Sequence, residues 1–234
     1  MADTKNRFIQ DMFSQVPATY ERVNHVLTFG LDIVWRKRAA RLAARAESGR
    51  WIDMCTGTGE TAACLARLAR PGTAVFALDL SQSMMAVAGE KPEAEKIHFV
   101  AGDTKHLPFP DDSFDLITMS FATRNLNLSK ESLIQSFAEY RRILKSGGRF
   151  VNLETSQPSF GLFRKCVQLY VKLSVKSIGG RISGSRSAYA YLAATIPRFY
   201  PPEELARILR QAGFGEVAYR RQLGGAAAIH LAVK

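Results

Sequence analysis

The sequence predicts an α/β fold with a mostly parallel, seven-stranded sheet, helices on both faces and an inserted helical cap. The first observation is that apolar runs of strand length alternate with stretches of helical periodicity from residue 50 onward. The second is a glycine-rich turn after the first of these runs, which is typical of a nucleotide-binding βαβ unit. The third is the length of 234 residues with 47% hydrophobic residues, which suits one domain over 1–234.

The first 48 residues form a separate helical segment in this prediction. Apolar side chains recur at helical spacing over 5–47. Pro17 and Gly30 interrupt the pattern, because proline disrupts a helix interior and glycine favours a helix end. We therefore expect a broken helical segment ahead of the sheet.

Strands and helices then alternate. The expected strands are 51–54, 74–79, 97–100, 113–120, 149–153, 216–221 and 226–233. The expected helices are 61–68, one that begins after Ser81, 130–144 and 202–212. Ser81 is a favoured N-cap, while Gly147 and Gly213 follow the last two helices and suit a helix end. A segment at about 158–197 does not fit the alternation, and we expect it to form a helical cap over the substrate.

Composition restricts the partners and the compartment. The net charge of +11 fits nucleic acid, anionic lipid headgroups or an acidic substrate as a partner, or simply a basic solvated surface. The three cysteines form no CxxC pair, so we expect neither a disulfide framework nor a metal site. No apolar stretch reaches about 18 residues and no secretory signal is visible, which predicts a cytoplasmic protein unless it rests on a membrane surface.

The glycine-rich turn carries the first functional signal. Gly57 and Gly59 follow the first strand and precede a helix, where glycine lets the backbone approach a ligand closely. Asp79 ends the second strand, 20 residues after Gly59, where a carboxylate can bind both hydroxyls of a ribose. Because Ala62 completes a G-x-G-x-x-A pattern, these residues alone also fit a dinucleotide site.

Acidic residues around the turn distinguish the two ligands. Asp53 at the end of the first strand and Glu60 beside the turn would repel a pyrophosphate at the helix N-terminus. S-adenosylmethionine carries an ammonium and a sulfonium and no phosphate, so these acids favour it. Asp103 follows the third strand, where it could accept from an adenine amino group or instead form an Asx-turn or helix cap. Ser120 ends the fourth strand and would face the same cleft.

Further motifs carry a resemblance to a known family over nearly the whole chain. They are Tyr20-Glu21-x-x-Asn24, Phe29-Gly30 with Trp35-Arg36, Leu107-Pro108-Phe109, Phe121-x-x-Arg124-Asn125, Gly147-Gly148-Arg149, Tyr189-x-Tyr191-Leu192 and Leu223-x-Gly225 with His230. With these motifs the chain resembles the UbiE/MenG family of quinone C-methyltransferases, which have a class I Rossmann-like methyltransferase fold. The Tyr20 and Arg124 motifs are the most specific, whereas Leu-Pro-Phe and Gly-Gly-Arg occur in many methyltransferases.

The resemblance implies methyl transfer from S-adenosylmethionine to a ring carbon of a polyprenylated benzoquinol or naphthoquinol, with S-adenosylhomocysteine as the product. Carried over by position, the cofactor residues join Asp53 in the set Gly57, Thr58, Gly59, Asp79, Asp103, Thr104 and Ser120. The quinol site would comprise Tyr20, Arg124 and Asn125, with Arg124 as the cation that stabilises a phenolate. The chain departs from the family pattern at His25, Leu173 and Ser187, which bears on the acceptor more than on the cofactor.

Several of these residues could instead have a purely structural role. Arg124 could form an ion pair with a nearby acid, Tyr20 could be a packed helix residue, and none of the four histidines is assigned to catalysis. Residues 160–178 read as a helix with apolar positions on one side and Arg164, Lys165, Lys172 and Lys176 mostly on the other. That helix would be a lid, or a basic element that rests on an anionic membrane.

A methyltransferase for another small phenolic metabolite and an RNA-binding methyltransferase are the alternative functions. The basic charge suggests RNA, but no RNA-binding module and no Asn/Asp-Pro-Pro-Tyr motif is present, so nucleic acid is not favoured. A homodimer is a further expectation.

Overall fold

The computed structural model describes residues 16–104 and 106–234. The start of the predicted N-terminal helical segment, over 5–15, lies outside these residues. The segment that follows consists of α2 (Pro17–Thr28) and α3 (Leu31–Ala43). Pro17 occupies the first turn of α2, and Gly30 between the helices has a φ of 75°, as the helix-breaking pattern predicts.

Seven strands form one sheet in the order β3-β2-β1-β4-β5-β7-β6. The strands are β1 (Arg50–Met54), β2 (Ala74–Asp79), β3 (Ile97–Ala101), β4 (Phe114–Ser120), β5 (Leu144–Thr155), β6 (Glu216–Gln222) and β7 (Ala227–Val233). Neighbours among β1 to β5 are parallel, and β7 is antiparallel to both β5 and β6. The predicted fold class is confirmed. Successive strands are added in one direction from β1 to β3 and in the opposite direction from β4 onward, so the strand order switches between β1 and β4. A ligand crevice is expected outside the carboxyl ends of these two strands.

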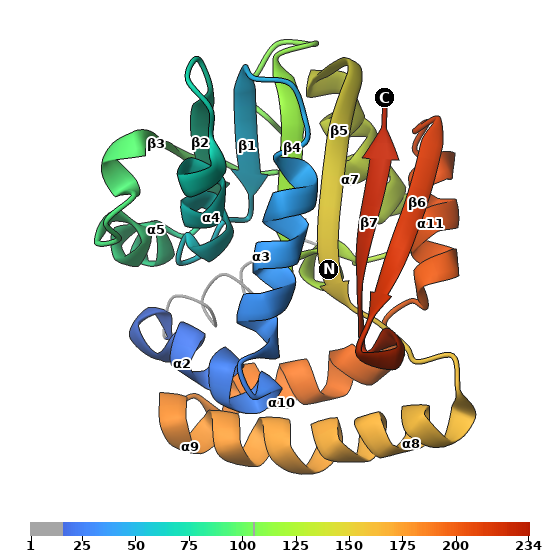
Figure 1. Cartoon of the computed structure of the whole chain (residues 1–234). Coiled ribbons are helices and arrows are strands. Elements are labelled where there is room, and N and C mark those ends of the chain that lie inside the picture. Colours follow the sequence, from blue (N-terminus) through green and yellow to red (C-terminus); the bar gives the residue numbers. More distant parts are fainter. Residues whose placement is uncertain (1–15, 105) are drawn as a thin grey trace.

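Helices cover both faces of the sheet (Figure 1). α3 and α4 (Glu60–Leu68) pack on one face around Trp51, which is fully buried. α7 (Lys130–Ile143) and α11 (Pro202–Gln211) pack on the other face around Phe114. Each fully buried side chain of this size contributes about 1.5–3 kcal/mol to folding. α5 (Gln82–Gly89) connects β2 to β3, and the predicted N-cap Ser81 accepts a hydrogen bond from the backbone of Met84.

The insertion after β5 forms a cap of helices. α8 (Gly161–Tyr170), the π-helix η2 (Val171–Gly179) and α9 (Gly180–Ser183) run on as one long helix across the carboxyl end of the sheet (Figure 1). α10 (Arg186–Thr195) returns above it and leads into η3 (Ile196–Arg198), with Tyr189 packed so closely on Gly179 that a Cβ there would lie 2.2 Å from its ring. No helix within 16–104 and 106–234 combines the length and the hydropathy that crossing a bilayer requires.

One local prediction is wrong. The helix predicted over 130–144 is present over Lys130–Ile143, but β5 begins at Leu144 and includes the glycines that were expected to close the helix. The register between β4 and β5 shifts between Phe114 and Leu116, which accommodates Gly147 at a φ of 74° as part of a bulge. The short helices α6 (Thr123–Leu126) and η4 (Leu223–Gly225) were also not expected.

Candidate active site

Asp53 connects the glycine-rich turn to the neighbouring strand β4. The Thr56 hydroxyl donates to Asp53 Oδ2 at 2.7 Å, and the Thr118 hydroxyl of β4 donates to Asp53 Oδ1 at 2.6 Å. The Asp53 carboxyl is 1% exposed, and burial raises its pKa to about 6 even though both threonine hydroxyls lower it. Asp53 thereby joins the ends of β1 and β4, the two strands at the crevice.

The turn above Asp53 has left-handed backbone at Gly57 and Gly59, with φ values of 56° and 79°. A Cβ on Gly59 would lie 2.7 Å from the Cβ of Ala88 in α5, so the site requires glycine there. A Cβ on Gly57 would meet open space. Gly57 therefore leaves its backbone accessible to a ligand at the crevice.

Asp79 contacts the turn from β2. Its Oδ2 accepts the Gly57 N–H at 2.8 Å, and its Oδ1 accepts the Ser81 N–H at 2.8 Å. Burial raises its pKa, while these backbone hydrogen bonds lower it. Each carboxylate oxygen has a further lone pair, so the pair of oxygens is still able to accept two ribose hydroxyls.

The remaining predicted cofactor residues differ in orientation. Thr58 and Thr104 are buried, and the Thr104 side chain lowers the pKa values of Cys55 and Tyr140, which burial raises. Asp103 lies two residues beyond β3 and Ser120 is the last residue of β4; both are half-buried, and Ser120 Oγ accepts from the Thr61 hydroxyl at 2.9 Å. The structure thus brings the predicted residues to one edge, although Asp53 and Thr104 face the protein.

The chemistry of this edge fits S-adenosylmethionine. Asp53, Asp79 and Asp103 supply acidic groups around an accessible glycine backbone, which suits a ligand that carries positive charge and a ribose. A pyrophosphate at the start of α4 would lie beside Glu60, the first residue of that helix.

A cavity of about 390 Å³ lies between the sheet end and the cap. Its wall is mainly apolar and comes from α2, α3, α8, η2, α10 and η4, with Leu27, Phe29, Trp35, Phe121, Phe163, Val167, Tyr170, Val171, Val175, Leu192 and Leu223 among the lining residues. The polar lining residues include Tyr20, Arg36 and Arg124. An apolar cavity with a few charged and hydroxyl groups suits an aromatic acceptor with a lipid tail.

Arg124 is held in a buried ion pair. It lies in α6, and its Nη1 is 3.3 Å from Glu154 Oε1 and donates to the Thr155 hydroxyl at 3.1 Å. Its backbone N–H donates to Glu154 Oε2 at 3.1 Å. Arg124 is 7% exposed and Glu154 is 1% exposed. Arg124 therefore forms the ion pair with a nearby acid that was considered for it, and it also lines the cavity. Sequence reasoning missed Glu154, whose only signal was an acid within an apolar strand.

Tyr20 and Asn125 differ in placement. Tyr20 is half-buried and lines the cavity, and burial raises the pKa of its hydroxyl while Arg36, Asn24 and Arg124 lower it. Asn125 follows Arg124 in α6 and is not among the described residues that line the cavity. Its Oδ1 is buried without a hydrogen-bond partner among the described residues.

His230 has the structural role that was weighed for the histidines. It is 1% exposed and its Nε2 lies 3.0 Å from the Pro202 carbonyl oxygen. Burial lowers its pKa to about 4, so the ring is neutral at pH 7.

The fold, the acidic glycine-rich edge and the adjacent apolar cavity define a class I methyltransferase. A solved S-adenosylmethionine-dependent methyltransferase from Thermotoga maritima has the same fold, with a TM-score of 0.68 at 20% identity over 96% of this chain and 99% of that chain. The model of the ubiE/COQ5 methyltransferase family matches residues 1–234.

Relatives in sequence agree. A demethylmenaquinone methyltransferase of Thermus thermophilus is 38% identical over 222 residues, which cover 94% of this chain and 98% of the relative. A demethylmenaquinone methyltransferase of Staphylococcus aureus is 34% identical and covers 100% of this chain and 97% of the relative. The chain belongs to the ubiE/COQ5 methyltransferase family, and the protein is a methyltransferase.

Proposed function

We propose that the protein transfers a methyl group from S-adenosylmethionine to a ring carbon of a polyprenylated demethylated quinol, either a demethylmenaquinol or a benzoquinol precursor of ubiquinone. The observation that carries the proposal is the apolar cavity with two arginines, Arg36 and Arg124, in its wall beside the cofactor edge. Family membership and relatives named for demethylmenaquinone support it.

At the cofactor edge, Asp79 would accept from the ribose hydroxyls and Asp103 from the adenine amino group. Gly57, Thr58 and Gly59 would form the floor under the methionine portion, with Ser120 beside it at the end of β4. Asp53 and Thr104 would not contact the cofactor directly. They would hold the glycine-rich turn in place, and the negative charge of Asp53 would favour a cationic ligand. The bound cofactor supplies an activated methyl group on a sulfonium.

At the acceptor end, the quinol hydroxyl must ionise so that the neighbouring ring carbon becomes nucleophilic. Arg124 would stabilise the resulting phenolate, since its guanidinium remains charged at any working pH. Tyr20 would remain protonated and donate a hydrogen bond, because burial raises its pKa. Asn125, one residue beyond Arg124, would act through a hydrogen bond to the acceptor or to a water.

The reaction is balanced without a further co-reactant. The ring carbon forms a bond to the methyl carbon while the carbon–sulfur bond breaks, with its electron pair remaining on sulfur in S-adenosylhomocysteine. The ring hydrogen then leaves as a proton. The protein's contribution is to align the three atoms and to exclude water, and the apolar cavity wall suits both tasks.

The decisive experiment is a transfer assay with labelled S-adenosylmethionine. The acceptors are a demethylated naphthoquinol, a demethylated benzoquinol, a tail-less phenol and bulk RNA. We expect label in a prenylated quinol and little in the phenol or the RNA. Label in RNA alone would overturn the proposal, and label in the tail-less phenol alone would assign the cavity to a soluble metabolite.

The outward face of α8 and η2 supports contact with an anionic membrane. Exposed leucines alternate with lysines along it, namely Leu162, Lys165, Leu169, Lys172, Leu173 and Lys176. Their spacing places them on one side of the long helix. Phe163, Val167, Tyr170 and Val171 line the cavity instead, and Arg164 Nε donates to the Pro158 carbonyl. A cytoplasmic protein that rests on the membrane through this face would receive a lipid quinol directly.

Liposome sedimentation tests the membrane contact. Changing Lys165, Lys172 and Lys176 to Glu is expected to abolish binding to vesicles that contain anionic lipid. The matched control changes Lys37 and Arg41 on the exposed face of α3, and Arg45 just beyond the end of that helix, to Glu, which alters the net charge equally. Equal loss in both variants would mean that overall charge, not this face, determines binding. The expected homodimer stays a prediction.

A further inference from the structure

Four ionisable side chains from three helices form a closed ring beside the cavity. His25 Nδ1 of α2 lies 2.9 Å from Asp32 Oδ2, and Asp32 Oδ2 lies 3.9 Å from Arg36 Nε one turn further along α3. Arg36 Nε lies 3.2 Å from Glu60 Oε2, and Glu60 Oε1 lies 3.6 Å from His25 Nε2. Because Glu60 directly follows the glycine-rich turn, the ring connects α2 and α3 to the cofactor edge.

The ring keeps a buried cation in the cavity wall. Arg36 is 7% exposed, and burying a guanidinium without partners would cost several kcal/mol. Asp32 and Glu60 offset this cost, and the Phe121 ring lies 4.8 Å from the guanidinium carbon in cation–π geometry. Thr28 holds Asp32 in turn, by donating to its Oδ1 at 2.6 Å.

The contacts of Arg36 leave one end of its guanidinium for a ligand. Both of its ion-pair contacts run through Nε, at the base of the planar group. Arg36 is nevertheless a lining residue of the cavity, as Arg124 is. Arg124, by contrast, uses Nη1 for Glu154 and Thr155. Arg36 Nε is buried without a hydrogen-bond partner among the described residues, so Asp32 and Glu60 hold the guanidinium as ion-pair partners alone. The terminal nitrogens of such an arginine can act as a two-pronged donor to an oxygen anion.

The pKa of the Tyr20 hydroxyl responds to both Arg36 and Arg124. Arg36 and Arg124 both lower the pKa of the Tyr20 hydroxyl, against the larger effect of burial. Both guanidinium groups are therefore within electrostatic reach of a phenolic oxygen at this end of the cavity.

We propose that Arg36 is a second catalytic cation of the acceptor site, which hydrogen-bonds the ionised hydroxyl oxygen of the quinol together with Arg124. His25, Asp32 and Glu60 are positioning residues that hold Arg36 in place. This inference rests on the proposed quinol methylation. Through Glu60, the ring would then fix the position of the acceptor oxygen relative to the glycine-rich turn that holds the cofactor.

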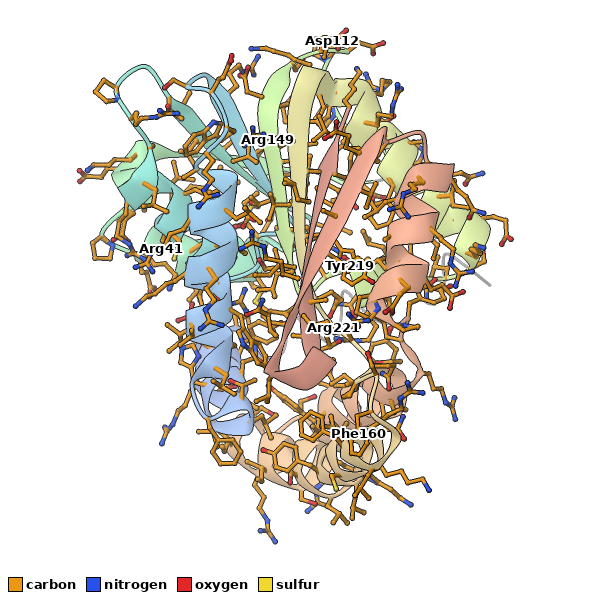
Figure 2. The ribbon with its side chains drawn as sticks, turned by 45° about the vertical axis from the view of Figure 1, so that its right-hand side comes forward. Arg41, Asp112, Arg149, Phe160, Tyr219 and Arg221 are labelled. Carbon is orange, nitrogen blue, oxygen red and sulfur yellow. The ribbon has the colours of Figure 1, made fainter. Side chains whose placement is uncertain are left out.

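The test compares Arg36→Met with Arg41→Met, its match on the exposed side of α3 (Figure 2). The measurements are the dissociation constant of S-adenosylmethionine by calorimetry and the pH profile of kcat for the quinol. Other ionisable groups that face Arg36 or the cavity end are His25, Asp32, Glu60, Tyr20, Arg124, Glu154 and Tyr191. Among these, Tyr20 and Tyr191 have pKa values raised above the ordinary value of a phenol near 10. A limb of the kcat profile at or below 10 is therefore assigned to the quinol hydroxyl.

Removal of a cation raises the pKa of a nearby phenol. Because the hydroxyl must be ionised, kcat rises with pH through its pKa. Arg36→Met is expected to raise the apparent pKa of this rising limb by about one unit and to lower kcat at pH 7.5 about tenfold, with cofactor affinity within about threefold of wild type. Arg41→Met should match wild type in all three measurements. An unshifted limb would overturn the proposal. So would a large loss of cofactor affinity with unchanged kcat at saturation, since Arg36 would then hold the cofactor carboxylate.

Two further variants cover folding and the positioning role. Arg36→Lys keeps a charge near Glu60, and we expect about tenfold lower kcat because lysine cannot donate in the same planar geometry. If Arg36→Met does not fold, unchanged kcat in Arg36→Lys overturns the proposal. Asp32→Asn should shift the rising limb less than Arg36→Met does, and it should add nothing in the double variant. Wild-type transfer to the quinol in the same assay separates a failure of this inference from a failure of the proposed function.

Discussion

The two ends of the active site are built in different ways. At the cofactor edge, Asp53, Gly57 and Asp79 lie within one βαβ unit and contact one another through short loops. At the acceptor end, the cavity combines α2 and α3 with α8, η2 and α10 from the other half of the chain. A single hydrogen bond there, from the Tyr170 hydroxyl to the Leu27 carbonyl, spans 143 residues of sequence. Local backbone geometry forms the first site, and long-range packing forms the second.

Charge is also handled differently at the two ends. Carboxylates at the cofactor edge are held by neutral donors, namely the hydroxyls of Thr56 and Thr118 at Asp53 and backbone N–H groups at Asp79. They retain negative charge for a cationic ligand. Arginines at the acceptor end are each paired with carboxylates, so they remain buried as cations without an anionic ligand. Losing one partner should therefore be more costly at the acceptor end.

The largest expected effect is at the acceptor end, in Arg124→Met. This change leaves the Glu154 carboxylate buried and unpaired, so the free energy of unfolding should fall by about 3–5 kcal/mol. Chemical denaturation measures this loss, and the folded fraction should show about 100-fold lower kcat. In the double variant Arg124→Met/Glu154→Met we expect stability to recover and kcat to remain low. Recovery of both would show that Arg124 has only a structural role.

The next effect is at the cofactor edge, in Asp79→Asn. Loss of charge-assisted hydrogen bonds to the ribose should weaken cofactor binding about 100-fold, with a smaller change in stability than for Arg124→Met. Calorimetric titration with S-adenosylmethionine measures this. Asp112→Asn is the control, because Asp112 lies at the end of the sheet opposite the cap (Figure 2) and asparagine tolerates its φ of 54°. Equal affinity in the two variants would remove Asp79 from the site.

A pH dependence sharpens the comparison at Asp53. Its folded pKa of about 6 exceeds the unfolded value of 3.8, so the folded state binds the proton more tightly and stability falls as pH rises from about 4 to about 6. The shift corresponds to at most about 3 kcal/mol. Asp53→Asn should remove this slope. Denaturation of both proteins across pH 4–7 measures the difference, and parallel curves would contradict the prediction.

The same ionisation should appear in cofactor binding. A cationic ligand favours the ionised carboxyl, so the affinity of wild type for S-adenosylmethionine should rise with pH through about 6, whereas Asp53→Asn should bind with a flatter pH profile. Calorimetry at pH 5 and pH 7 distinguishes the two outcomes. A wild-type affinity that does not change over this range would exclude Asp53 as an electrostatic contributor.

The smallest effect tests how α8 is held over the cavity. Tyr170→Phe removes the hydrogen bond to Leu27 and should cost about 0.5–1.5 kcal/mol of stability. We expect a severalfold higher KM for the quinol with unchanged cofactor affinity, since only the acceptor end is loosened. Tyr219→Phe in β6, far from the cap (Figure 2), is the control. An equal KM in both variants would mean that this bond does not shape the cavity.

The cofactor edge was accessible from sequence because its information is local. The strand–turn–helix order around Gly57 and Gly59, and acids at successive strand ends, are periodic features that any parallel sheet brings to one edge. Two roles changed on folding. Asp53 and Thr104 are buried within the protein: the hydroxyls of Thr56 and Thr118 hold the Asp53 carboxyl, and Thr104 lies close enough to Cys55 and Tyr140 to lower their pKa values.

The acceptor end depended on tertiary structure. Sequence reasoning identified Tyr20 and Arg124 only through motifs, and it found neither the Glu154 partner nor the ring of His25, Asp32, Arg36 and Glu60. No spacing rule relates an acid in β5 to an arginine in α6, or a histidine in α2 to the start of α4. Those contacts exist because α2, α3, α4 and α6 meet at the carboxyl end of the sheet, where burial makes the pairing of each charge decisive.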